Sequence, residues 1–230
     1  MSTFSMLMPV LLPALFWAGY HYHKDRHLPE PAGHLLLCFV LGGVAAVLAK
    51  GMYVSLGYFG LRFDAFELAA TNLPGLFAYA MLAIGPIEEL AKLLPFLLLV
   101  LRFSEFDEPI DGIIYASFIG LGFAAAENLY YLQFLTPIEA IARGFASPVV
   151  HIVFASIWGY RIGAARISGR TGVGVILTSF AIAALLHGLY DYIVLQQPFF
   201  ALPVAAGIIV AIWIWRLKIM QKLHADATQS

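Results

Sequence analysis

Charged residues are scarce in this chain of 230 residues. Asp, Glu, Lys and Arg make up 12% of it, against about 25% in an ordinary soluble domain, and 61% of the residues are hydrophobic. This composition, with a mean hydropathy of +0.85, is that of an integral protein of the lipid bilayer. The formal net charge is −1, so no basic surface is large enough to neutralise many phosphates. Nucleic-acid binding is therefore excluded.

Cysteine is almost absent as well. The only one, Cys38, excludes an intrachain disulfide and is most simply a small apolar filler within a helix. The chain also lacks repeats, low-complexity segments and any linker long enough to join a second domain. We therefore expect a single transmembrane domain over residues 1–230. Residues 1–20 lack the basic region of a cleaved signal peptide and are expected to form a retained first span.

Long apolar runs dominate the sequence and predict an all-α, polytopic bundle of about seven transmembrane helices. The predicted spans cover about residues 4–20, 34–58, 73–101, 112–134, 144–162, 172–195 and 199–215. The third is expected to be one long helix, kinked at Pro86. The histidines of the first polar loop, His21, His23 and His27, are interpreted as interfacial and solvated. Lys50, alone in the second span, would pair with an acid or snorkel toward the interface.

Basic residues fall mostly on one side of a seven-span arrangement, and cytoplasmic loops are enriched in them. This places the N-terminus outside and the C-terminus in the cytoplasm. Only Arg62 and Arg143 lie on the outer side. The basic residues on the cytoplasmic side are Lys24, Arg26, Arg102, Arg161, Arg166, Arg170, Arg216, Lys218 and Lys222.

Two carboxylates and an ammonium interrupt the third span, in Gly85-Pro86-Ile87-Glu88-Glu89-Leu90-Ala91-Lys92. An ionisable group at the bilayer centre costs at least about 2.5 kcal/mol, so three together indicate chemistry or transport. Lys92 lies at i,i+4 from Glu88 and i,i+3 from Glu89, so it can neutralise either acid. The other acid then becomes a candidate general base or acid. A structural ion pair within the bundle is the alternative interpretation.

The next three spans carry few titratable groups. Glu127, His151 and His187 lie at a predicted depth similar to that of Glu88, roughly 17 to 23 Å from the cytoplasmic face at 1.5 Å per residue. A single layer favours a site over an ion path, which would string polar residues across several depths. Asp191, at i,i+4 from His187, can orient its imidazole or share a ligand position with it.

Two neighbours of Glu127 have supporting roles in this interpretation. Asn128 either serves helix packing or donates a hydrogen bond to an oxyanion, and Tyr131, at i+4, can hydrogen-bond Glu127.

Carboxylates and imidazoles in one layer suit the activation of water, by a glutamate base or through a metal such as zinc. His151 and His187 with Glu127 or Asp191 can form a three-ligand zinc site that keeps an open position. No Ser-His-Asp set lies in this layer and Cys38 is elsewhere, so a covalent nucleophile is not expected. The zincin signature H-E-x-x-H is also absent.

The set Glu88-Glu89-x-x-Lys92, Phe123-x-x-x-Glu127-Asn128, His151 and His187-x-x-x-Asp191, each on a separate predicted helix, resembles the PrsW family of intramembrane proteases. That family is related to the CAAX prenyl endopeptidases and the bacteriocin-processing proteins. The motifs lie within about residues 73–195.

The resemblance implies a multi-pass peptidase of the bacterial inner membrane that cuts a membrane-anchored protein, such as an anti-sigma factor. It implies Glu88 as the general base, Glu89 as a partner of Lys92, and His187 with Asp191 as holders of water or the oxyanion. Glu127 stands where the CAAX-processing relatives have a histidine, which argues against prenylated substrates.

Two other classes of protein would also use buried acids. A proton-coupled or ion-coupled transporter would move protons or ions across liposomes. A noncatalytic immunity or binding protein would form a partner complex that survives mutation of Glu88.

Overall fold

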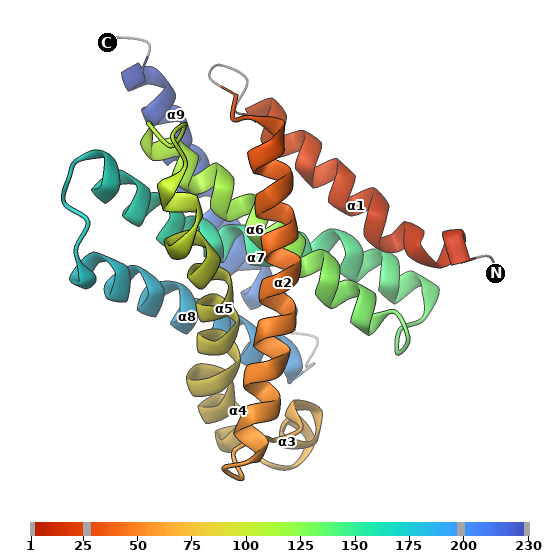
Figure 1. Cartoon of the computed structure of the whole chain (residues 1–230). Coiled ribbons are helices and arrows are strands. Elements are labelled where there is room, and N and C mark those ends of the chain that lie inside the picture. Colours follow the sequence, from red (N-terminus) through yellow and green to blue (C-terminus); the bar gives the residue numbers. More distant parts are fainter. Residues whose placement is uncertain (1–2, 25–28, 197–200, 228–230) are drawn as a thin grey trace.

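The computed structural model describes residues 3–24, 29–196 and 201–227, and the regular secondary structure of these residues is entirely helical (Figure 1). The elements in order are α1 (Thr3–Lys24), α2 (Ala32–Gly57), α3 (Ala65–Thr71), α4 (Leu73–Tyr79), the π-helical turn η1 (Ala80–Ile84), α5 (Gly85–Leu98), the short 3₁₀ turn η2 (Val100–Arg102), α6 (Pro109–Tyr131), α7 (Pro137–Ile167), α8 (Val173–Leu195) and α9 (Ala201–Ala227).

Five helices in the described part of the chain are long and apolar enough to cross a membrane: α2, α6, α7, α8 and residues Leu202–Ala225 of α9. The protein is therefore a multi-pass membrane protein. The first of the seven predicted spans corresponds to α1, and the third is divided among α4, η1 and α5.

The third predicted span follows a continuous helical path, but its irregularity begins before Pro86. Ala80–Ile84 form a π-helical turn in which the Gly85 backbone N–H donates to the Ala80 carbonyl, five residues back. Pro86 follows directly and has no N–H to offer the preceding turn, so a wider turn accommodates it. The prediction of a kink at Pro86 alone was thus incomplete, because the distortion occupies the turn before it.

Several predicted boundaries were wrong because local caps extend or create helices. The loop expected around Asp64 contains α3, whose N-cap Asp64 accepts hydrogen bonds from the Phe66 and Glu67 backbone N–H groups. α7 begins at Pro137, seven residues before the predicted start at 144, behind a capping box made by Thr136 and Glu139.

The centre of the bundle is the antiparallel pair α6 and α7. In the most apolar 18-residue stretch of α6, 83% is buried inside the molecule, and in the corresponding stretch of α9 only 11% is buried. α9 therefore lies at the periphery. Gly112 of α6 and Gly159 of α7 each lie directly against the other's carbonyl, and Gly42 of α2 lies against the Ile119 carbonyl of α6. Small residues thus let these helices approach closely.

A second close contact joins α5 to α8. A Cβ on Gly85 would meet the Ala184 carbonyl and lie 2.7 Å from the Gly188 nitrogen, and a Cβ on Gly188 would meet the Ala80 carbonyl. Only glycine fits at these two positions. The first turn of α5, with its two glutamates, is therefore held against the middle of α8, where His187 lies.

The prediction that His21 belongs to a solvated loop was wrong. His21 is part of α1 and is fully buried beside Arg216 of α9, which is also fully buried rather than anchored at the surface. His23 is exposed, and His27 lies outside the described residues. Lys50 is exposed, with its Nζ 4.6 Å from the centre of the Tyr130 ring.

Candidate active site

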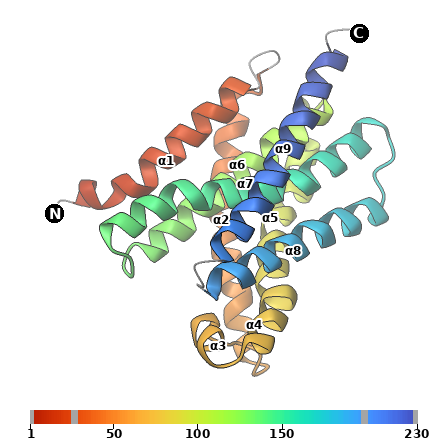
Figure 2. The same cartoon turned by 180° about the vertical axis from the view of Figure 1, so that it is seen from behind.

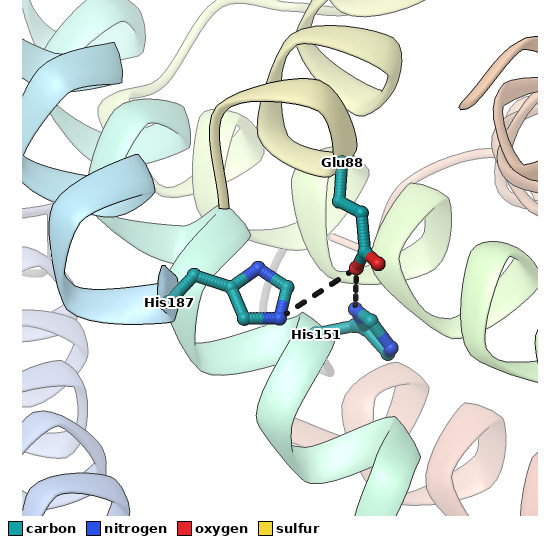
Figure 3. Close-up of side chains that lie close together, drawn as sticks. All are labelled: Glu88, His151 and His187. Carbon is teal, nitrogen blue, oxygen red and sulfur yellow. Dashed lines mark ion pairs between the residues drawn. The ribbon is translucent and has the colours of Figure 1, made fainter. Parts of the chain in front are cut away.

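Glu88 lies at the centre of the site, in the first turn of α5, and only 7% of it is exposed. Figure 3 shows its carboxylate facing both imidazoles. Oε2 of Glu88 lies 3.7 Å from His187 Nε2 and 4.0 Å from His151 Nδ1. The other oxygen, Oε1, accepts a hydrogen bond from the Tyr53 hydroxyl of α2 at 3.2 Å. Three helices, α5, α7 and α8, thus bring one carboxylate and two ring nitrogens to a common point.

Glu89 is fully buried and has a different environment. Its carboxylate accepts from Lys92 Nζ at 2.5 Å, from Trp158 Nε1 at 2.8 Å, and lies 2.8 Å from His187 Nδ1. Lys92 therefore pairs with Glu89 and not with Glu88. Three partners saturate the Glu89 carboxylate, which leaves Glu88 as the acid without a strong cationic neighbour on its own helix.

Each imidazole is oriented by a second carboxylate. His187 Nδ1 faces Glu89 at 2.8 Å, so it carries the ring proton and its Nε2 is free to act as a ligand or acceptor. His151 Nε2 lies 3.0 Å from Glu127 Oε2, while its Nδ1 accepts from Lys92 at 3.1 Å and faces Glu88. One nitrogen of each ring therefore points toward Glu88, and the carboxylates behind the rings fix the tautomers.

The more exposed edge of the site is formed by Glu127 and Arg143. Arg143 lies 2.9 Å from Glu127 Oε2, and the side chains of these two residues are 33% and 20% exposed. Tyr131 does not bond Glu127 in the way that its spacing suggested. Its ring instead lies under the Arg143 guanidinium, 4.0 Å away. The buried Oδ1 of the neighbouring Asn128 has no hydrogen-bond partner, so this amide is available to a bound molecule.

Asp191 lies one turn beyond His187 on α8. Its Oδ2 is 3.6 Å from His187 Nε2, and 21% of its side chain is exposed. The structure thus brings these residues singled out from the sequence around one centre: Glu88, Glu89, Lys92, Glu127, Tyr131, His151, His187 and Asp191.

Sequence reasoning missed three side chains of this site. Tyr53 stands in the apolar second span and Trp158 in the fifth, where an aromatic residue gives no signal of its own. Arg143 was noted only for its side of the membrane. Its position eight residues before His151, two turns along the same helix, was the available clue.

The arrangement fits a divalent metal. Ligand atoms of Glu88, His151 and His187, one from each residue, all lie within 4.8 Å of one another. Two imidazoles and a carboxylate are a donor set typical of catalytic zinc, and carboxylates behind ligand histidines are its usual support. Compared with the set expected from the sequence, Glu88 takes the place beside the histidines that Glu127 or Asp191 was expected to fill.

Comparison with known proteins gives an independent line of evidence. Residues 30–216 match the family described as PrsW family intramembrane metalloprotease. The chain is 30% identical over 197 residues to the protein named Protease PrsW of Geobacillus kaustophilus, covering 84% of this chain and 81% of that protein. Its identity to Protease PrsW of Bacillus subtilis is 30% over 192 residues, covering 83% of each. The corresponding protein of Clostridioides difficile is 28% identical over 222 residues, covering 94% and 88%. No solved structure matches the chain.

Proposed function

Because this chain belongs to the PrsW family of intramembrane metalloproteases, we propose that its catalytic centre is the cluster of Glu88, His151 and His187. The protein is an intramembrane protease, and its reaction is the hydrolysis of a peptide bond of a protein substrate within the membrane. The observation that carries the proposal is the convergence of two imidazole nitrogens, one from each histidine, on one buried carboxylate, each ring being oriented from behind by another carboxylate.

In this proposal His151 Nδ1, His187 Nε2 and Glu88 would hold a zinc ion. When bound there, zinc would acidify a coordinated water and polarise the peptide carbonyl. Lys92 lies 3.1 Å from His151 Nδ1 and would have to turn toward Glu89, its ion-pair partner, to leave that nitrogen free.

The proton of the attacking water needs an acceptor beside the cluster. We assign this role to Asp191, whose carboxylate lies 3.6 Å from His187 Nε2 and is not engaged by a cation, whereas Glu127 is held by Arg143 and His151. This assignment moves Glu88 from the base expected from the sequence to a ligand. The unpartnered Oδ1 of Asn128 would accept a hydrogen bond from a peptide N–H of the substrate.

The membrane arrangement belongs to the same proposal. Seven crossings, with α4, η1 and α5 together forming the third, would put the N-terminus outside and the C-terminus in the cytoplasm of a bacterial inner membrane. The substrate class that we propose is a membrane-anchored protein such as an anti-sigma factor.

The test combines metal analysis with cleavage of a membrane-anchored reporter by the purified protein. We expect stoichiometric zinc in the wild type, and cleavage that stops on chelation. Glu88→Gln should lose both zinc and cleavage, by at least about 1,000-fold in rate. Asp191→Asn should keep zinc and lose about 100-fold to 10,000-fold in rate. The control Glu67→Gln, an exposed acid of α3, should behave as the wild type.

Three results would change these assignments. A Glu88→Gln variant that keeps its zinc but does not cleave would make Glu88 the base. Unchanged cleavage by that variant would remove the cluster from the catalytic centre, and cleavage by a metal-free wild type would remove the zinc.

A further inference from the structure

A second buried polar cluster lies between α1, α6, α7 and α9, apart from the catalytic centre. At its centre is Arg216 of α9, which is fully buried. Arg216 donates to Ser156 Oγ at 3.0 Å, to Ser117 Oγ at 3.1 Å and to His21 Nδ1 at 3.0 Å. His21, Ser117 and Ser156 are also fully buried. All the partners of this guanidinium are thus neutral groups.

The cluster has hydrogen-bond donors left over and no counter-charge. Within the described residues no ion pair joins Arg216 to an acid, and its Nη1 has no hydrogen-bond partner. His21 Nε2 has none either. Because His21 Nδ1 accepts from Arg216, the ring proton of a neutral His21 is on Nε2, which is therefore a second unused donor. A buried cation with two unused donors in one network is the complement of an anion.

The position of Arg216 indicates where an anion would come from. In Figure 2, α9 crosses in front of α7 on the outside of the bundle, and α9 is the least buried of the five long apolar helices. The Trp213 ring lies 5.4 Å from the Arg216 guanidinium, and the exposed Lys218 and Lys222 follow on the same helix. Aromatic and basic residues together mark the level of the lipid head groups, and basic residues there attract anionic lipids.

This cluster is separate from the protease centre. Ser156 and His151 are five residues apart on α7, which places them about 140° apart around the helix at 100° per residue. α7 therefore presents the catalytic histidine on one side and the Arg216 cluster on another.

We propose that Arg216 and His21 form a binding site for the phosphate group of an anionic phospholipid. The phosphate oxygens accept from Arg216 Nη1 and His21 Nε2, and their charge neutralises the guanidinium, a geometry to which arginine is well suited. Because Arg216 is fully buried, the phosphate reaches it where α1 and α9 meet, and the Trp17 and Trp213 rings, which pack edge to face there at 5.7 Å, move apart to admit it. The bound lipid then ties the two peripheral helices together.

The test uses the full chain in a neutral detergent. Native mass spectrometry measures the phospholipid that stays bound, and thermal unfolding is followed while phosphatidylglycerol, phosphatidylcholine or inorganic phosphate is added. For the wild type we expect retained phosphatidylglycerol and a saturable rise in Tm with this lipid only. Arg216→Gln should lose the retained lipid and need at least tenfold more phosphatidylglycerol for the same rise. Arg62→Gln, which removes an exposed charge between α2 and α3, should respond as the wild type.

Several outcomes would overturn the proposal. Equal responses of the wild type to phosphatidylglycerol and phosphatidylcholine would do so without any variant. A rise with inorganic phosphate as large as that with the lipid would show a site for free phosphate instead. Should Arg216→Gln fail to fold, His21→Leu removes one donor and keeps the charge, and an undiminished lipid response in that variant would also contradict the proposal.

Discussion

Replacing Glu89 by glutamine should destabilise this protein far more than the same change at Glu88, although the two residues are adjacent. The Glu89 carboxylate is fully buried and accepts from Lys92, His187 and Trp158. In Glu89→Gln the amide NH₂ group would face the Lys92 ammonium or one of the other two donors, so that donors would meet without an acceptor.

The expected magnitude follows from the burial of the ion pair. Removing one partner of a buried pair costs about 3 to 5 kcal/mol, because the other charge stays buried without compensation. Replacing both partners by uncharged residues of similar size is often close to neutral. The double variant Glu89→Gln/Lys92→Met should therefore lose less than the sum of the two single changes, by about 0.5 to 3 kcal/mol. All three variants should cleave at least about tenfold more slowly, since His187 loses its orienting carboxylate or Glu89 loses the ion pair with Lys92 that holds it in place.

The free energy of unfolding is measured in mixed micelles by titration with a denaturing detergent, for the wild type, both single variants and the double variant. Glu88→Gln serves as the control, with metal removed from all the variants by chelation, since among the described residues Glu88 makes only one direct hydrogen bond, to Tyr53. The result to compare is the loss of unfolding free energy in the double variant against the sum of the losses in Glu89→Gln and Lys92→Met. Agreement to within about 0.5 kcal/mol would refute a buried pair whose members depend on each other.

Two further changes test the positioning of the site. Tyr53→Phe removes the hydroxyl that donates to Glu88. It should slow cleavage by roughly tenfold, equivalent to about 1.4 kcal/mol, with little change in Tm. An unaltered rate would leave Tyr53 without a role in cleavage. Gly188→Ala places a methyl group against the Ala80 carbonyl, and should lower both Tm and activity by pushing α5 away from α8. The matched control Gly43→Ala, with nothing within 4 Å of the added Cβ, should keep both, and equal effects at the two glycines would contradict the packing argument.

The side chains that meet in the candidate site could largely be predicted from the sequence because polar residues are rare in this chain. Within apolar spans Glu88, His151 and His187 stand out individually, and the cost of burying them makes a shared site the simplest explanation. The predicted spans also located the long helices, although their ends shifted where caps such as Asp64 were not recognised.

The sequence could not decide which of two nearby acids pairs with a given cation. Lys92 is within one turn of both glutamates, and only the packing of α5 against α7 and α8 gives it to Glu89 and leaves Glu88 facing the two histidines. The same holds for the roles of the acids. A local spacing of i,i+4 suggested Asp191 as a partner of His187. The carboxylate that faces one nitrogen of His187 and one of His151 is that of Glu88, which comes from another helix.

By itself the sequence determined the class of protein, the helical spans and the set of titratable side chains, since these follow from hydropathy and from the cost of charge in lipid. The tertiary structure alone decided which of those side chains meet. Glycines such as Gly85 and Gly188 let backbones touch, and this contact fixes the rotation and height of each helix. The same packing buried His21 and Arg216 together, although nearly the whole chain separates them. Contacts between distant helices depend on the joint fit of many side chains, which local sequence patterns do not encode.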